Sequence, residues 1–310
     1  MENMNICVVI VTYNRLNKLQ KALQSYESQT CPPHCIIVVN NDSTDGTHDY
    51  LSQWSVSNSN IPERIIINLD VNTGGAGGFY VGMKRALDTN ADWIWVSDDD
   101  AYPDKDALLH VQQYAENHPK DTVCICGAVY LNGTIDIDHR RISKNRFIKL
   151  PYKLLKDCYN KQEVLIEETT FVGSCFNAEA VRKAGLPLKE FFIYFDDTEY
   201  SYRIGHYGNI VLLPDIKITH DTITYAQPTN VIATWRDYYL IRNHIYTLRC
   251  HHIPSFFAYC LKKIYDSLIS YTRRHNTKQL KMYCLAILHG ITGHLGLHHI
   301  YKPGYNLYAQ

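Results

Sequence analysis

The sequence lacks a surplus of either charge, an apolar run of membrane-spanning length and a basic N-terminal segment. Lys and Arg together number 31, as do Asp and Glu, so no overall field attracts nucleic acid or repels anionic substrates. No apolar run approaches the ~18 residues of a membrane span. The segment from Met1 to Asn5 carries Glu2 where a secretory signal has basic residues, which argues against such a signal. We therefore expect a cytoplasmic protein without a nucleic-acid partner.

Regular cysteine spacing is also missing. The ten cysteines are scattered, mostly in apolar surroundings, and neither Cys124 with Cys126 nor Cys31 with Cys35 has a second pair beside it. Zinc sites and disulfide frameworks need such spacing. We predict free, largely buried thiols and no zinc site.

The sequence does contain alternating strand and helix patterns, in a chain of 310 residues of which 45% are hydrophobic. Apolar runs rich in β-branched residues occupy positions 6–11, 36–39 and 65–69, and segments with helical spacing lie over 15–28 and around Tyr50. This alternation predicts a parallel sheet covered by helices. Such sheets bind ligands at the carboxyl ends of their strands.

Three consecutive carboxylates follow the apolar run from Trp93 to Val96. Asp98, Asp99 and Asp100 repel one another unless a positive group neutralises them. A hard divalent cation does so and usually also holds substrate phosphates. Taken alone, the segment fits a solvated acidic turn equally well, so the other motifs must decide.

A glycine cluster lies within residues 72–79, ahead of a predicted helix. Gly74, Gly75, Gly77 and Gly78 remove side chains where the backbone approaches a ligand, and amides at the helix start favour anionic groups. The spacing matches neither GxxxxGK[ST] nor a clean GxGxxG pattern. Because the aspartates lie nearby, we interpret the cluster as the floor of a sugar-nucleotide pocket.

A second acidic cluster follows the aromatic segment from Phe191 to Phe195. It contains Asp196, Asp197 and Glu199. An aromatic wall can raise the pKa of a carboxylate toward that of a working base. The same residues also suit the first turn of a helix, and the two interpretations do not exclude each other.

Further segments extend the strand and helix pattern. Residues 171–176 predict a strand, 178–185 a short helix, and 211–219 an apolar stretch that ends at His220. A single histidine after a strand is more often structural than a metal ligand. The polar stretch over 136–149 is predicted to be a loop or hairpin.

Beyond residue 225 the pattern becomes helical. Two apolar stripes consist of Phe257, Leu261, Ile264, Leu268 and Tyr271, and of Leu280, Cys284, Ile287, Ile291 and Leu295. Basic residues lie between them, namely Lys262, Lys263, Arg273, Arg274, Lys278 and Lys281. Such stripes usually pack on a domain, but a basic amphipathic surface also suits an anionic membrane.

In combination, these motifs resemble inverting family 2 glycosyltransferases of the GT-A fold. The resemblance rests on residues 9–15, 41–47, 98–100, 196–200 and 213–220, whose order and spacing agree over roughly residues 5–225. It implies an α/β chain with a Rossmann-like, mostly parallel sheet. The catalytic domain would span residues 1–225, and a C-terminal helical region would span 226–310.

Within the family, the glycine cluster and the three aspartates look most like UDP-galactofuranosyltransferases. Rhamnosyltransferases share segments like those over 238–243 and 290–296 but usually carry a shorter glycine signature. The resemblance implies transfer of galactofuranose from UDP-galactofuranose to a lipid-linked surface glycan, such as an O-antigen or a capsule. The alternative donors are dTDP-rhamnose and other UDP-hexoses, and a sugar-nucleotide-binding protein without turnover is the second alternative.

The resemblance also implies roles for individual residues. Asp98, Asp100 and His220 would bind a divalent metal, and the histidine favours Mn²⁺ over Mg²⁺. The metal would neutralise the departing UDP, and Asp197 would act as the general base for in-line attack that gives a β-linkage. The residues expected to bind the donor are Thr12, Tyr13, Asn14, Asn40, Asp42, Gly74, Gly75, Gly77, Gly78, Asp98 and Asp99.

The remaining expectations concern the acceptor, the base and the cell membrane. Asp196 and Glu199 would hold donor hydroxyls or orient the base, while Trp235 and Arg242 would contact the acceptor. At most two of five aromatic residues are expected to stack on sugar rings, and these are Trp93, Trp95, Phe192, Tyr194 and Trp235. Asn40 stands where many relatives have an aspartate that reads uracil. The resemblance allows for an oligomer and for peripheral contact of the C-terminal helices with the inner face of the cytoplasmic membrane.

Overall fold

The first part of the chain alternates strands and helices in the predicted order. The computed structural model describes residues 4–118, 121–143, 151–222 and 233–308. Its first elements are β1 (Ile6–Thr12), α1 (Leu16–Glu27), β2 (Cys35–Asn40), α2 (Thr47–Val56), β3 (Glu63–Asn68), α3 (Gly74–Leu87) and β4 (Trp93–Asp98). β1 pairs in parallel with β2 and with β4, and β2 pairs in parallel with β3. The carboxyl ends of these four strands therefore meet at one edge of the sheet.

The strands β1 and β2 are continuous apolar runs because they are buried on both faces. Every residue of the two strands is buried. Successive side chains point to opposite faces, so Val9 packs in one core with Met83 of α3, and Ile10 packs in another with Leu19 of α1. The predicted α/β architecture with a mostly parallel, helix-covered sheet is confirmed.

The middle of the chain adds antiparallel strands and short helices. The elements are β5 (Ala101–Pro103), α4 (Ala107–Asn117), β6 (Thr122–Leu131), β7 (Thr134–Ile135), β8 (Arg140–Ser143), β9 (Pro151–Lys153), η1 (Lys156–Asn160), β10 (Val164–Ile166), β11 (Glu168–Thr169), β12 (Ser174–Asn177), α5 (Ala178–Ala184), η2 (Lys189–Phe191), α6 (Asp196–Ile204) and β13 (Asn209–His220). In the described ranges the main sheet has the order β10-β13-β6-β12-β4-β1-β2-β3, and β8, β9 and β11 form a smaller sheet.

Three predicted segments differ in detail from the structure. The strand predicted over 171–176 is shortened to β12, because Gly173 has a φ of 67° and turns the backbone. The apolar stretch over 211–219 belongs to one strand, β13, with irregularities in its register. Of the polar stretch over 136–149, the first part forms β8, and residues 144–149 lie outside the described residues.

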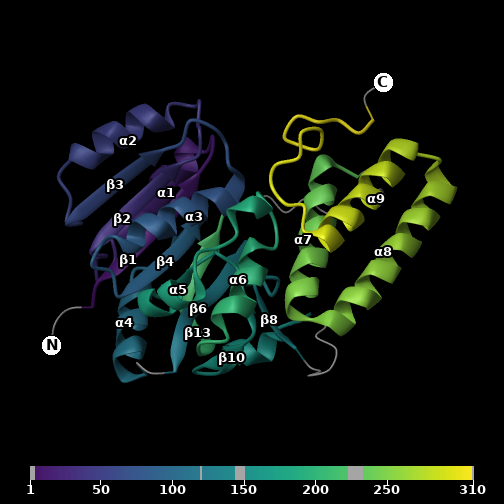
Figure 1. Cartoon of the computed structure of the whole chain (residues 1–310). Helices are drawn as coiled ribbons and strands as arrows, with labels where there is room; N and C mark the ends of the chain where they lie inside the picture. Colours follow the sequence, from purple (N-terminus) through teal and green to yellow (C-terminus); the bar gives the residue numbers. More distant parts are fainter. Residues whose placement is uncertain (1–3, 119–120, 144–150, 223–232, 309–310) are drawn as a thin grey trace.

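Three helices lie beside the sheet, as Figure 1 shows in green and yellow. They are α7 (Trp235–His251), α8 (Ile253–Arg274) and α9 (Thr277–Thr292). Tyr238, Tyr239, Ile245 and Met282 belong to their core, which also takes in Phe192 from the segment before α6. The predicted C-terminal helices are confirmed. The predicted boundary between the two domains falls outside the described residues and stays a prediction.

The cysteines form no disulfide. All ten are free thiols, as predicted, and six of them are buried. Among the described residues, no helix has the length and apolar character needed to cross a membrane.

Candidate active site

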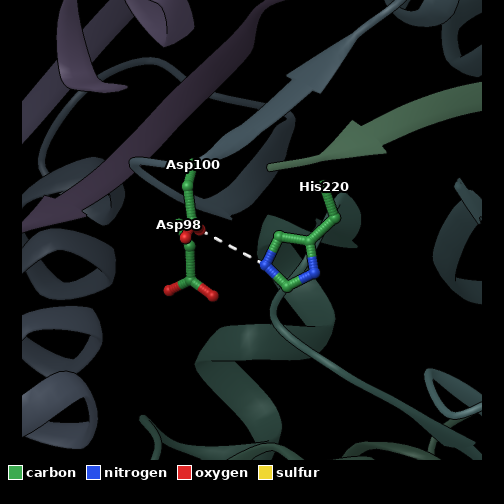
Figure 2. A group of neighbouring side chains, drawn as sticks. All are labelled: Asp98, Asp100 and His220. Atoms are coloured by element: carbon green, nitrogen blue, oxygen red, sulfur yellow. Dashed lines mark ion pairs between the residues drawn. The ribbon is translucent and has the colours of Figure 1, made fainter. Parts of the chain in front are cut away.

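Strand register brings Asp98, Asp100 and His220 together at the carboxyl edge of the sheet. Asp98 ends β4, and Asp100 lies in the turn between β4 and β5. β13 runs antiparallel to β5 and sets His220 opposite Ala101. One potential ligand atom of each of the three residues lies within 4.8 Å of the others. Figure 2 shows the imidazole directed at the two carboxylates.

These three residues fit a divalent cation. Nδ1 of His220 is buried and has no hydrogen-bond partner among the described residues, and a buried group left unsatisfied costs ~1–3 kcal/mol. Oδ1 of Asp100 is also buried, and it pairs with Nε2 of His220 at 3.3 Å. Burial, together with the charges of Asp100 and Asp99, raises the pKa of Asp98 to about 7. A bound cation would pair with these atoms and favour the ionised form of Asp98. Oxygen and imidazole ligands suit Mn²⁺, and oxygen ligands suit Mg²⁺.

Two basic residues that the motifs did not single out flank the aspartates. Nη1 of Arg15 lies 2.8 Å from Oδ2 of Asp100 and 3.3 Å from Oδ1 of Asp99. Nζ of Lys18 lies 3.5 Å from Oδ2 of Asp100. Burial favours the neutral carboxyl of Asp100, but the imidazole of His220 and the charge of Arg15 outweigh it and lower the pKa. Asp100 is therefore ionised at neutral pH and available as a ligand.

Asp99 has a different environment from the other two aspartates. Oγ1 of Thr12 donates a 2.7 Å hydrogen bond to its Oδ2, which ties the end of β1 to the turn after β4. Burial raises the pKa of Asp99 to about 6, although this hydrogen bond opposes the shift. Asp99 does not belong to the group of three potential metal ligands.

A cavity of about 640 Å³ opens at this edge of the sheet, within the range of ~300–1,000 Å³ that is typical of small-molecule sites. The predicted site residues that line it are Thr12, Tyr13, Gly74, Gly75, Asp98, Asp99, Asp196, Asp197, His220 and Trp235. Asn41, His139, Arg141, Arg236 and Leu240 also line it and were not predicted. Asn41 and Leu240 belong to segments that were quoted only for the resemblance, and the other three lie in no motif.

Asp197 lies in the first turn of α6 and lines the cavity. Thr198 donates to its Oδ1 from the backbone nitrogen at 2.6 Å and from Oγ1 at 3.3 Å. Burial raises the pKa of Asp197, and the positive charge of Arg141 opposes this shift. Burial and the charge of Asp197 raise the pKa of Asp196 well above its ordinary value. A carboxylate with a raised pKa is a stronger proton acceptor, so this turn can supply a general base.

The segment that carries these aspartates is held in place by α7. Phe192, Tyr194 and Phe195 have φ values of 66°, 67° and 67°, which non-glycine residues adopt only at a cost in energy. Nδ2 of Asn243 donates hydrogen bonds of 2.9–3.0 Å to three backbone carbonyls within residues 191–194. The C-terminal helices therefore stabilise the strained turn that positions the candidate base.

Arg242 was predicted to contact the acceptor, and this prediction is wrong. Its side chain is buried, with an exposed fraction of 1%, and does not line the cavity. It donates hydrogen bonds to the backbone carbonyls of Glu190, Phe191 and Gly296. Arg242 thus supports the same strained segment as its neighbour Asn243.

Glu199 was predicted to hold donor hydroxyls or orient the base, and the structure contradicts this as well. Its buried carboxylate lies 2.7 Å from Nη2 of Arg203 and 3.2 Å from Nε2 of His251, and it does not line the cavity. Glu199 lies on the side of α6 that faces α7. It therefore connects these two helices.

The glycine cluster forms the first turns of α3 instead of preceding the helix. Gly74 and Gly75 line the cavity, whereas Gly77 and Gly78 do not. A methyl group added at Gly78 would overlap with the side chain of Val11 on β1. The prediction that the glycines form the pocket floor is therefore wrong for Gly77 and Gly78. Gly78 instead permits close packing of α3 on the sheet.

Three residues predicted to contact the nucleotide shape the turn after β2 and do not line the cavity. Asn40 donates a 2.9 Å hydrogen bond to Asn68 and accepts one from the backbone nitrogen of Ser43. Asn14 accepts a hydrogen bond from the backbone of Thr44, and Asp42 is exposed. The neighbouring Asn41 lines the cavity in their place, and its side chain donates to the carbonyl of Gly74.

The five aromatic residues considered for stacking on sugar rings fall into a buried group and a group that lines the cavity. Trp93 and Trp95 lie in the core of the sheet, with exposed fractions of 3% and 0%, so neither can stack on a sugar ring. Phe192, Tyr194 and Trp235 line the cavity. The choice for sugar stacking is therefore limited to these three.

Comparison with known proteins agrees with this geometry. The family model described as "Glycosyl transferase family 2" matches residues 7–180. Galactofuranosyltransferase GlfT1 of Mycolicibacterium smegmatis is 29% identical over 216 residues, which are 66% of this chain and 66% of that protein. The dTDP-rhamnosyl transferase RfbF of Shigella flexneri is 28% identical over 308 residues, which are 95% of this chain and 98% of that protein.

Among solved structures, a crystal structure of GalNAc-T7 with UDP, GalNAc and Mn²⁺ resembles this fold. The TM-score is 0.64 at 15% identity, and the match covers 94% of this chain and 58% of that chain. At this identity the likeness concerns the fold alone. The chain thus spans about two thirds of the length of the mycobacterial relative and little more than half of GalNAc-T7.

Proposed function

The chain belongs to glycosyl transferase family 2 and has the predicted GT-A fold, and from this premise we propose that it transfers galactofuranose from UDP-galactofuranose to a glycan hydroxyl. The observation that carries the proposal is the placement of Asp98, His220 and Asp197 around one cavity. A group that can hold a metal and a group that can act as base thus face the same space. In an inverting transfer the cation would stabilise the leaving diphosphate while the base activates the acceptor hydroxyl.

In this mechanism the chain's own residues prepare the acceptor hydroxyl. Asp98, Asp100 and His220 would hold the divalent cation, which neutralises the charge of the leaving diphosphate. Both hydrogen bonds from Thr198 go to Oδ1 of Asp197, so Oδ2 is the oxygen free to accept the hydroxyl proton within the described part of the chain. Attack on the face opposite the diphosphate inverts the anomeric centre and gives a β-linkage.

The donor is the least constrained part of the proposal. Galactofuranose is favoured by the glycine cluster, the three aspartates and the mycobacterial galactofuranosyltransferase. Rhamnose is the second candidate, because the dTDP-rhamnosyl transferase matches along almost the whole chain. Mn²⁺ is favoured over Mg²⁺ because an imidazole belongs to the ligand group.

Nucleotide release distinguishes these donors. Purified protein is incubated with Mn²⁺, soluble methyl glycosides of galactose, rhamnose and N-acetylglucosamine as acceptors, and either UDP-galactofuranose or dTDP-rhamnose. Free UDP or dTDP is measured against the variant Asp197→Asn. Release of UDP by the natural protein alone supports galactofuranose, and release of dTDP supports rhamnose. Binding of a sugar nucleotide without any release would favour a non-catalytic binding protein and contradict the proposal.

The proposal includes a lipid-linked acceptor and peripheral contact with the inner face of the cytoplasmic membrane. Helix α8 exposes large apolar side chains along one face, namely Ile253, Phe257, Leu261, Ile264, Tyr265 and Leu268. Lys262 and Arg273 on the same helix are exposed, and so are Lys278 and Lys281 on α9. We call the six apolar side chains the α8 face. An exposed apolar face on a helix that also exposes basic residues suits an anionic bilayer, and a second copy of the chain is the alternative partner.

A further inference from the structure

A second cavity lies between α7, α8 and α9, outside the site described above. Its volume is about 370 Å³, which falls within the range typical of small-molecule sites, ~300–1,000 Å³. The three helices pack against one another (Figure 1). The polar residues at this cavity include Asp237, Lys263, Asp266, Arg273, Gln279 and Tyr283. None of them has a part in the proposed reaction.

The charges around this cavity balance. Asp237 and Asp266 contribute two carboxylates, and Lys263 and Arg273 contribute two cations. A phosphate group would face both carboxylates, and an acyl chain would remove all four charges from water, so both ligands are unfavourable. A neutral molecule rich in hydroxyl groups can donate to the carboxylates and accept from the cations. Tyr283 adds a ring with an apolar face and a polar edge. This lining suits a sugar residue.

Gln279 contributes an unsatisfied amide to the cavity. Its Nε2 donates to Oγ of Ser270 at 3.2 Å and to the hydroxyl of Tyr283 at 3.0 Å. Its Oε1 is buried and has no hydrogen-bond partner among the residues that the structure describes. Turning the amide over exchanges the two atoms but still leaves one of them unpaired. A ligand hydroxyl that reaches the amide would remove this cost.

Leu240 separates this cavity from the active-site cavity. It is the residue of α7 that lines both of them. Trp235 and Arg236 line the active-site cavity on one side, and Asp237 and Ile241 line the second cavity on the other. The two cavities are therefore adjacent across one side chain. A glycan with its reacting hydroxyl in the first cavity has its next residues within reach of the second.

We propose that the cavity between α7, α8 and α9 binds a sugar residue of the acceptor glycan, behind the residue that is glycosylated. This inference rests on the proposed glycosyl transfer and names an acceptor subsite for it. An acceptor of two or three sugars fills both cavities, whereas a single sugar fills only the first. Two added hydrogen bonds correspond to about tenfold tighter binding of the longer acceptor.

The test compares saccharides of different length on the whole chain loaded with UDP and Mn²⁺. The probes are soluble methyl glycosides of galactose, rhamnose and N-acetylglucosamine with one, two or three residues, and saturation-transfer NMR measures their binding. Lys263→Ala removes a lining cation, and Ser270→Leu fills the cavity. Lys262→Ala is the matched control, because it removes the same charge from the same helix. Lys262 also pairs with Asp266, at 3.5 Å, but does not line the cavity.

The natural protein and Lys262→Ala should bind a longer saccharide about tenfold more tightly than its single-sugar counterpart. Lys263→Ala and Ser270→Leu should lose this gain and still bind the single sugar. The inference is overturned if no probe binds, if length has no effect, or if the two lysine variants behave alike. If Ser270→Leu does not fold, the comparison of Lys263→Ala with Lys262→Ala still tests the inference.

Nucleotide release separates this inference from the proposed function when the same proteins and saccharides are incubated with Mn²⁺ and UDP-galactofuranose or dTDP-rhamnose in place of UDP. Release of UDP or dTDP without a length effect contradicts the acceptor subsite alone. Absence of any release contradicts the proposed transfer itself.

Discussion

Nε2 of His220 lies 3.3 Å from Oδ1 of Asp100, and sheet register is the reason. β13 pairs antiparallel with β5, so His220 stands opposite Ala101 and next to Asp100. Asp98 closes the group from the end of β4. The geometry of the candidate metal site therefore depends on buried strands, which hold side chains more rigidly than loops do.

Replacing His220 with alanine should weaken Mn²⁺-dependent UDP binding. Loss of a residue that only supports a metal ligand already costs ~10–100-fold in affinity, so loss of a direct ligand should cost at least about tenfold. Titration calorimetry with UDP, with and without Mn²⁺, measures this effect. Asp221→Ala is the control, because Asp221 adjoins His220 but is exposed and lies outside the ligand group. Equal UDP affinity in the natural protein and His220→Ala would remove His220 from the metal site.

Replacing Asp197 with asparagine should abolish transfer and leave UDP binding nearly unchanged. The amide keeps the size and the hydrogen bonds from Thr198 but cannot accept the acceptor proton, and a general base contributes ~10²–10⁴-fold to rate. Nucleotide release gives the rate, and calorimetry gives the affinity for UDP with Mn²⁺. A parallel loss of both would show that Asp197 positions the nucleotide instead.

Glu199→Gln should lower stability by about 1.5–3 kcal/mol, the range for a hydrogen bond to a charged group, and leave catalysis intact. The loss should stay moderate because Arg203 also donates to the carbonyls of Ala184 and Leu186. Denaturant unfolding measures the difference between the natural protein and the variant. A variant that folds as stably but transfers more slowly would restore Glu199 to the active site.

The stability difference between the natural protein and Glu199→Gln should also depend on pH. Burial alone would raise the pKa of Glu199, but the hydrogen bond from His251 and the pairing with Arg203 hold it below its ordinary value of 4.5. A lowered pKa means that the stabilisation is present above that value and is lost as the pH falls. The two unfolding curves should converge below pH 4.5, and a constant difference across this range would contradict the ion pair.

Several residues that the motifs singled out line one cavity, because strand ends can be recognised in the sequence. Each apolar run ends where a polar residue begins, and parallel strands bring those ends to one edge. Thr12, Asp98 and His220 all end strands, and all three line the cavity. The expectation that Asp196 and Asp197 suit the first turn of a helix agrees with α6, which begins at Asp196.

Helix faces and distant partners were harder to predict. Glu199 was assigned to the active site, although it lies four residues before Arg203, a spacing that allows an ion pair along a helix surface. Arg242 gave no such signal, because its partners are backbone carbonyls of a strained segment far away in the sequence. Gly78 and Gly82 are four residues apart and lie on the face of α3 that packs against Val11 and Val9 of β1, a spacing that was not used in the prediction.

Two alanine substitutions distinguish the glycine roles. Gly78→Ala should destabilise the protein by about 1–3 kcal/mol through overpacking, because the new methyl group overlaps with Val11. Gly75→Ala meets no atom within 4 Å and should raise stability by about 0.5–1 kcal/mol through helix propensity. It should nevertheless weaken donor binding, because Gly75 lines the cavity. Thermal unfolding and UDP titration test both substitutions. Equal effects of Gly78→Ala and Gly75→Ala on stability would contradict the different roles of the two glycines.

Leu261→Asp should reduce binding to anionic vesicles at least about tenfold, because burying a leucine in an apolar layer is worth ~1.5–3 kcal/mol. The control is Leu165→Asp on β10, since Leu165 is 60% exposed and Leu261 is 69% exposed. Cosedimentation with vesicles of anionic and of zwitterionic lipid measures the effect. If neither the natural protein nor the variants bind, and Leu261→Asp instead elutes as a smaller species from a sizing column, the α8 face contacts a second copy of the chain.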